Sequence, residues 1–159
     1  MEFNIEVKGL EEFNRDLKRF PPEAKTEFQK AMVSSTTKIK NDIQANITSK
    51  GISNTGQLRR SVNVIKASFD KGIVGVGEKY GLFVEGGTRP HFPPVAPLER
   101  WAQTKLGQSG LGFVIARKIA QRGTKAQPFV EPAYKQDINF VVKQFDYAIL
   151  KLVRSLGKK

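Results

Sequence analysis

The sequence predicts an α+β fold: a small antiparallel sheet with long N-terminal and C-terminal helices packed on one face, plus a short helical insertion. Three observations favour this class. Two long segments, one near each end of the chain, carry apolar residues at helical spacing. A strand pattern opens the chain, and a hairpin pattern follows the first long helix. Strands and helices do not alternate as they would in a parallel sheet.

The first third of the chain predicts a strand and two helices. Residues 2–7 alternate polar and apolar, which is typical of a short strand, and Gly9 ends it. Residues 10–20 predict a short helix that stops at Pro21-Pro22. A long helix then runs to Lys50-Gly51, where a cation and a glycine form the usual stop. Its expected inward stripe is Ala24, Phe28, Met32, Ser35, Ile39, Ile43 and Ile47.

The middle of the chain predicts a hairpin, flanked by two short segments whose secondary structure the sequence leaves open. Residues 54–62 (NTGQLRRSV) fit either a loop or a single helical turn. Residues 62–77 predict two strands, joined at residues 69–72. Tyr80 to Val84 form a short apolar segment, which fits either one or two helical turns or a strand.

The last half predicts a helical insertion and a long final helix. Joints rich in glycine and proline bracket the insertion, at roughly 93–127. Within it we expect a helix over 99–106, with Trp101 and Leu106 inward, and another over 113–121. The final helix covers 131–156, and its apolar face is Ile138, Val141, Phe145, Ile149, Leu152 and Leu156. The whole chain, 1–159, is expected to be a single domain.

Composition bounds the class of protein. A chain of 159 residues buries about 70% of the surface that its unfolded form exposes, so it folds without metal or disulfide. The absence of cysteine excludes disulfides, thiol nucleophiles and thiolate metal sites. No apolar run reaches the length of a membrane span, and the N-terminus lacks the pattern of a signal peptide. We therefore expect a soluble protein, made in the cytosol and without a membrane partner.

Catalytic patterns are weak throughout. The one histidine, His91, has no second histidine at ligand spacing, so we expect a loop residue that packs its ring or binds a backbone group. Glu78, Glu85 and Glu99 lie in or beside loops, but nothing in the sequence groups them. No nucleophile elbow or phosphate loop is present. We expect no enzyme, cofactor or metal; a hydrolase using Glu85 or His91 is a minor hypothesis.

Charge is large and uneven. The net charge is +12, and residues 107–159 hold ten basic residues against three acidic ones. Such a balance indicates a polyanion or an acidic protein surface as a neighbour. No motif for sequence-specific recognition of nucleic acid accompanies it. A non-specific basic nucleic-acid-binding protein is therefore the alternative function. The basic residues expected to face DNA or an interface are Arg117, Lys118, Arg122 and Lys125.

Three stretches in this order carry a resemblance to a known family. They are residues 55–62 (TGQLRRSV), 80–90 (YGLFVEGGTRP) and 122–133 (RGTKAQPFVEPA). They resemble the T-G-x-L-R-x-S, Y-x-x-[FY]-[VL]-E-x-G-T-x-P and [KR]-x-Q-P-[FY]-[LM]-x-P-A signatures of the tailed-bacteriophage HK-ninety-seven gene-product-ten-like family. Gly86 departs from the pattern, because the family often has a bulky residue there. The motif positions are Thr55, Gly56, Leu58, Arg59, Ser61, Tyr80, Glu85, Gly87, Thr88, Pro90, Gln127, Pro128, Phe129 and Pro132.

The resemblance implies a structural virion assembly protein of the head–tail joining, neck or tail-completion class. Such proteins act through protein–protein assembly at the head–tail junction, around the passage of the DNA. The implied partners are copies of the chain in a ring, commonly hexameric, the head connector, and the tail-tube or tail-terminator proteins. Non-specific contact with packaged DNA is also implied. The location is the virion, after assembly in the host cytoplasm. Within the motifs, we expect Glu85 to hold loop amides or a nearby arginine, Arg59 or Arg89.

Overall fold

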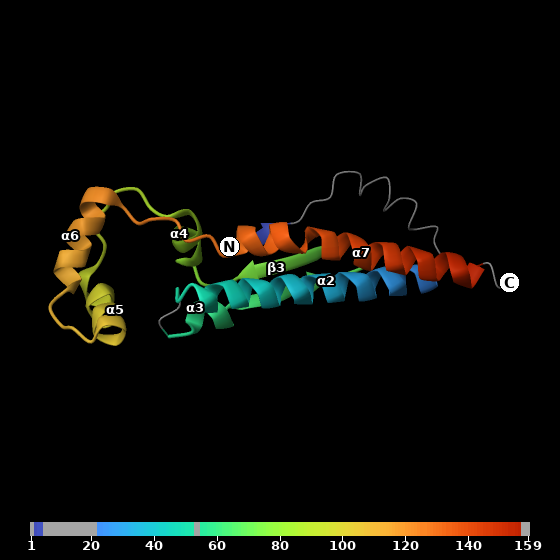
Figure 1. Cartoon of the computed structure of the whole chain (residues 1–159), viewed down its shortest axis with the longest axis horizontal. Helices are drawn as coiled ribbons and strands as arrows, with labels where there is room; N and C mark the ends of the chain where they lie inside the picture. The colour runs from blue at the N-terminus through green and yellow to red at the C-terminus, as the bar shows by residue number, and fades with distance from the viewer. Residues whose placement is uncertain (1, 5–21, 53–54, 157–159) are drawn as a thin grey trace.

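The computed structural model describes residues 2–4, 22–52 and 55–156. The predicted α+β class is confirmed (Figure 1). The helix expected over 10–20 and the end of the first strand lie outside the described residues. The elements are β1 (Glu2–Asn4), α2 (Pro22–Ser49), α3 (Gln57–Arg60), β2 (Val62–Ala67), β3 (Gly72–Val76), α4 (Gly81–Gly86), α5 (Val95–Leu106), α6 (Gly112–Arg122) and α7 (Val130–Leu156).

The sheet is antiparallel, and its strand order is β1-β3-β2. Val62 pairs with Val76 and Val64 with Val74, and the register shifts between Val64 and Lys66. The predicted hairpin is therefore confirmed. The two short segments of open assignment both prove helical: α3 is a single turn and α4 lasts six residues.

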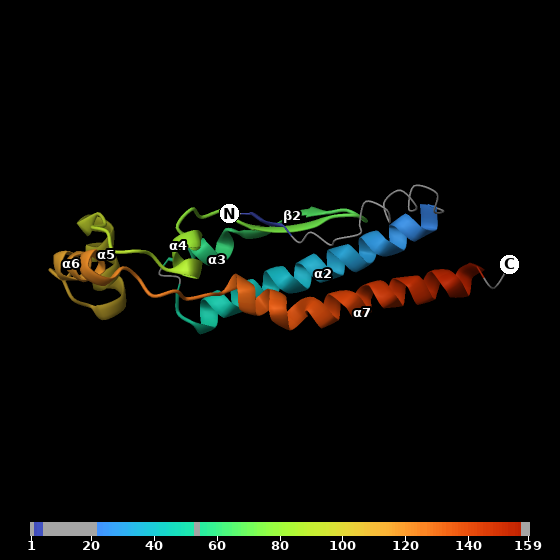
Figure 2. The ribbon, with the colours of Figure 1, turned by 90° about the horizontal axis from the view of Figure 1, so that it is seen from above.

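The two long helices form two further layers on one side of the sheet. Figure 2 shows the strands on one side, α2 beneath them, and α7 beyond α2. Contacts agree with this view, because α2 packs on β2 and β3 while α7 packs mainly along α2. The first turn of α7 and the partly buried Val141 reach the core beneath the sheet. Both helices thus lie on the same side of the sheet, as expected.

The core follows the stripe that the sequence predicts on α2. Six of its seven positions are buried, and Met32 is half-buried. The main cluster joins α2, α3, the sheet and the start of α7 through Ile39, Ile43, Ile47, Leu58, Val62, Val74, Val76, Phe129, Val130 and Ala133. A smaller cluster near the other end of α2 stacks Phe28 on Phe145, with ring centroids 6.1 Å apart.

The inward face of α7 differs in part from the expected one. Ile138 and Ile149 are 38% and 45% exposed, so their predicted burial is wrong. The buried positions of α7 are instead Val130, Ala133, Asp137 and Ala148. Two of these positions are alanines that face α2, whereas Ile138 and Ile149 lie away from it. The expected positions that do pack inward are Val141, Phe145 and Leu152.

The insertion forms a helical hairpin that lies apart from the long helices (Figure 1). Ala102 of α5 and Ala116 of α6 are fully buried between the two helices. The expected inward orientation of Trp101 and Leu106 is wrong, because they are 40% and 51% exposed. Only α6 covers α5 to any extent, so a two-helix unit cannot bury every apolar side chain of its helices. The helix ends before Gly107, as predicted.

Candidate functional site

The three motif stretches, far apart in sequence, meet at one packed junction. Leu58 from the first and Phe129 from the third are fully buried. Gly81 of the second lies between them, and a Cβ there would come within 3.3 Å of Leu58 Cδ1 and 3.1 Å of Val76 Cγ1. A larger residue would push these elements apart. The motif residues thus fix how α3, α4 and the start of α7 join.

Glu85 caps the N-terminus of α7. Its carboxylate accepts hydrogen bonds from the backbone amides of Phe129 at 2.6 Å, Val130 at 3.0 Å and Glu131 at 3.0 Å. The first amides of a helix have no partner within the helix, and its N-terminus favours negative charge. Glu85 was expected either to hold loop amides or to pair with an arginine. Its hydrogen bonds go to the amides.

The segment before α7 is held from two more sides. The amide of Gln127 donates to the carbonyl of Val84 at 2.8 Å. Asn46 Nδ2 donates to the carbonyl of Phe129 at 3.0 Å, and Lys50 Nζ donates to the carbonyl of Pro128 at 2.7 Å. These bonds tie the end of α2 to the third motif. Pro132 lies in the first turn of α7, where a helix tolerates the missing amide.

The insertion leaves the body through a narrow neck. Thr88 and Thr124 exchange backbone hydrogen bonds of 3.1 and 3.2 Å, and their hydroxyl oxygens lie 3.0 Å apart. Gly87 and Gly123 flank this pair, both with φ of 70°. A Cβ at Gly123 would lie 1.9 Å from the carbonyl oxygen of Thr88, and one at Gly87 would lie 2.5 Å from that of Thr124. Only glycine lets the two chain segments approach this closely.

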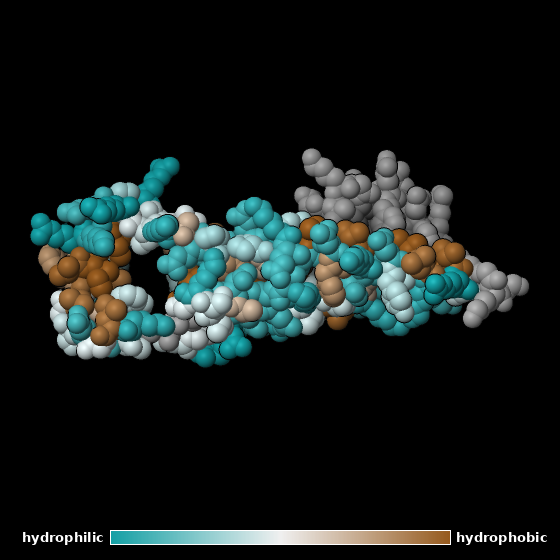
Figure 3. Space-filling model, viewed as in Figure 1, coloured by the Kyte–Doolittle hydropathy of each residue, from teal (hydrophilic) through white to brown (hydrophobic). Residues whose placement is uncertain are grey.

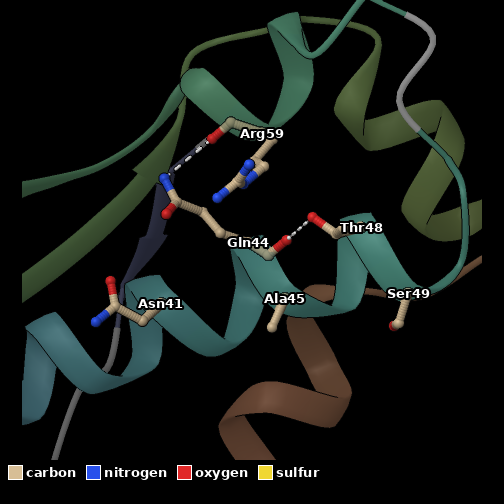
Figure 4. A pocket seen from close by; sticks show the side chains of 6 residues that line it. All are labelled: Asn41, Gln44, Ala45, Thr48, Ser49 and Arg59. Atoms are coloured by element: carbon tan, nitrogen blue, oxygen red, sulfur yellow. Dashed lines mark hydrogen bonds between the residues drawn. The ribbon is translucent and has the colours of Figure 1, made fainter.

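The first motif holds a one-turn helix over α2. Arg60 donates to the carbonyl of Thr55 at 3.0 Å, and Ser61 Oγ donates to that of Leu58 at 2.8 Å. Gly56 precedes the turn with φ of 77°. The side-chain amide of Gln44 donates to the carbonyl of Arg59 at 3.1 Å, which ties the turn to α2 (Figure 4).

His91 and its neighbours lie in an exposed loop of the neck region. Its Nδ1 is 2.9 Å from the carbonyl oxygen of Arg89, so His91 contacts a backbone group as expected. Pro90 beside it is exposed. Tyr80, at the start of the second motif, is 41% exposed, and partial burial raises the pKa of its phenol. Within residues 2–4, 22–52 and 55–156, no three His, Asp or Glu side chains cluster as metal ligands.

The insertion is stabilised by its own helix cap. The Glu99 carboxylate accepts hydrogen bonds from the amide of Gly110 and, at 2.7 Å, from that of Gly112 at the start of α6. These two amides lower the pKa of Glu99. Glu99 is therefore a structural residue of the hairpin.

The four predicted basic residues lie on α6 and just after it, and two of them, Arg122 and Lys125, belong to the third motif stretch. Arg117, Lys118, Arg122 and Lys125 are all exposed. Arg117 and Lys118 each follow an exposed apolar residue by one helical turn, Phe113 and Val114. The outer side of α6 is therefore both apolar and basic.

Exposed apolar side chains lie on α4, on both helices of the insertion and on α7, as Figure 3 shows for the insertion and for the edge of α7. On α4, Phe83 is 60% exposed. On α6, Phe113 is 58% exposed, and its ring lies 6.1 Å from that of Phe92. On α7, Val142 and Val153 are 52% and 60% exposed. Helical periodicity could not reveal this surface, since it does not say which apolar residues find a partner within the chain.

A buried charged group lies between α2 and α7. Asp137 is 2% exposed and accepts a hydrogen bond from Lys38 Nζ at 2.9 Å, and Lys38 also pairs with Asp42. Burial raises the pKa of Asp137, while Asp42 first and Asp137 second raise that of Lys38. Asp137 was not among the site residues expected from the sequence, because its polar neighbours Gln136 and Asn139 make it look like a surface position.

The recognisable motifs thus build a scaffold and a neck. Residues 11–87 match the family model described as "Bacteriophage HK97-gp10, putative tail-component". The match is to the same family as the resemblance, and it covers the first motif stretch and residues 80–87 of the second. The third stretch lies beyond the match. The family is one of phage tail components, which implies a structural role in the virion.

No curated protein and no solved structure matches the chain. Among the described helices, none is both long enough and apolar enough to cross a membrane.

Proposed function

We propose that the protein completes the phage tail at the head–tail junction, where copies of the chain close into a hexameric ring around the DNA passage. Its partners are the head connector and the tail-tube or tail-terminator proteins. The observation that carries this proposal is the apolar surface of α4, the insertion and α7. Exposed apolar surface of this kind marks a site of protein–protein contact.

The insertion supports a head-to-tail contact between subunits. It projects from the body on a narrow neck and presents Phe113 and Val114 beside Arg117 and Lys118. A ring requires two different surfaces that fit each other, one on each side of the subunit. The projecting hairpin supplies one surface, and the flank of α7, with Val142 and Val153, supplies the other.

Assembly is tested by native mass spectrometry and negative-stain imaging of the chain, alone and with purified connector and tail-tube proteins. We expect ring-shaped complexes that Phe113→Glu prevents, because a buried unpaired charge is costly. Gln121→Glu adds the same charge to an exposed polar position of α6 and serves as the matched control. Wild-type chain that binds neither partner would contradict the proposal.

The alternative, a non-specific nucleic-acid-binding protein, rests on the net charge of +12 and on the exposed basic residues of α6. It predicts DNA affinity that falls steeply as salt rises. Fluorescence anisotropy with duplex DNA at two salt concentrations separates the two functions. Tight retention of DNA at physiological salt, without ring formation, would favour the alternative.

A further inference from the structure

The one-turn helix α3 and the outer face of α2 border a shallow, open hollow. Its volume is about 460 Å³, and its walls are Asn41, Gln44, Ala45, Thr48, Ser49 and Arg59. Figure 4 shows five of these residues along α2, with the Arg59 side chain reaching toward them from α3. The lining contains one cation and no carboxylate.

The backbone of Arg59 is fixed while its guanidinium remains available. Leu58 is fully buried beneath the turn, and Gln44 Nε2 binds the carbonyl of Arg59 at 3.1 Å. None of the ion pairs among the described residues involves Arg59. A guanidinium without an ion-pair partner is a ready donor for a planar oxyanion, which it binds through two parallel hydrogen bonds.

Most of the other polar side chains that line the hollow already donate their hydrogen bonds within the chain. Gln44 already donates to the carbonyls of Arg59 and Val62, and the Thr48 hydroxyl donates to the carbonyl of Gln44. Ser49 Oγ likewise donates to a carbonyl of its own helix. Arg59 therefore supplies the one charged donor of the hollow, and Asn41 supplies a neutral amide on its wall.

We propose that this hollow binds a carboxylate side chain, Asp or Glu, of a neighbouring protein subunit. A single charge among neutral amides and hydroxyls matches one carboxylate. DNA binding would need several cations along a track, because each phosphate carries its own charge. This carboxylate site rests on the proposed assembly role, because the carboxylate would belong to another protein of the same virion.

The first test is an NMR titration of the full chain with a capped tetraglutamate peptide and, separately, with a 15-base-pair DNA duplex. We expect the peptide to shift the Arg59 Nε–H and Asn41 side-chain amide signals saturably. Arg59→Ala weakens the peptide's effect on Asn41 by about 10-fold or more, and Arg59→Lys weakens it less. Arg154→Ala removes the same charge from the far part of α7 and leaves the titration unchanged.

Two results of the titration would overturn the inference. One is the absence of a saturable shift at both residues. The other is tighter binding of the duplex than of the peptide in this hollow at physiological salt, which would assign the site to phosphate. Gln44 binds the backbone of Arg59, so Arg59→Ala keeps that contact, and circular dichroism verifies the fold.

The second test is genetic. A phage carrying Arg59→Glu is expected to lose plaque formation and to regain it through Asp→Lys or Glu→Lys in a virion protein. Revertants confined to codon 59 would overturn the choice of partner. A phage lacking the gene separates the two proposals: normal particles would remove the assembly role whatever the titration shows. Blocked assembly with a failed titration would remove the carboxylate site alone.

Discussion

The cap that Glu85 places on α7 gives a direct measure of how the second motif supports the fold. In Glu85→Ala, three backbone amides lose their acceptor. Those of Phe129 and Val130 belong to buried residues, whereas Glu131 is exposed and water can replace the carboxylate there. A buried donor left without a partner costs about 1–3 kcal/mol, so we expect Glu85→Ala to lower the free energy of unfolding by about 3 kcal/mol.

Glu85→Gln isolates the charge from the hydrogen bonds. Its one side-chain oxygen can still accept from the amides of Phe129 and Val130, as Oε2 does, whereas the exposed amide of Glu131, which binds Oε1, turns to water. The main loss is therefore the attraction between the carboxylate and the N-terminus of α7, which costs about 1 kcal/mol. Asp146→Asn removes an exposed charge from the same helix and should change stability by less than about 0.5 kcal/mol. Urea unfolding followed by circular dichroism gives all three values. An alanine variant within about 0.5 kcal/mol of wild type would refute the reasoning.

Three further predictions concern the helix pair, the neck and the insertion. Lys38→Met leaves the buried Asp137 without its cation and should cost about 2 kcal/mol at neutral pH. Burial raises the pKa of Asp137, so its ionisation opposes folding above the ordinary value of 3.8. The stability lost in Lys38→Met should therefore shrink when urea unfolding is repeated at a pH near 3.8. An equal loss at neutral pH and at the lower pH would contradict this. Gly123→Ala should lower the melting temperature, because its Cβ would lie 1.9 Å from a carbonyl oxygen. In Gly86→Ala the new Cβ meets open space within α4, so the melting temperature should stay unchanged or rise. A lower melting temperature for Gly86→Ala than for Gly123→Ala would contradict the prediction. Trp101, the chain's one tryptophan, is 40% exposed, so its emission should shift to shorter wavelength if the insertion becomes buried on assembly, and an unshifted spectrum in the ring would exclude that contact.

Periodicity was sufficient where one helix face meets the main core. The stripe on α2 is buried as expected because α2 lies between the sheet and α7, so a complete face is covered. The same reasoning was wrong for Ile138 and Ile149 of α7 and for Trp101 and Leu106 of α5. These helices have fewer neighbours, so part of their apolar surface stays outside.

The candidate site shows the same limit in its polar residues. The family signatures identified Glu85 and the segment around Phe129, but sequence spacing could not say that one caps the other across 44 residues. The hollow beside Arg59 also escaped notice, because Asn41 and Gln44 are unremarkable polar positions of a long helix. A contact between distant segments depends on packing, which no local pattern encodes.

The sequence by itself determined the α+β class, the hairpin, the long helices and the assignment to a phage protein family. Each of these depends on local periodicity, on glycine and proline, or on short motifs read in order. The tertiary structure alone decided which carboxylate caps which helix, where two glycines let the neck close, and which apolar faces remain uncovered. Those outcomes depend on the distance between residues far apart in the chain, and packing of the whole protein sets that distance.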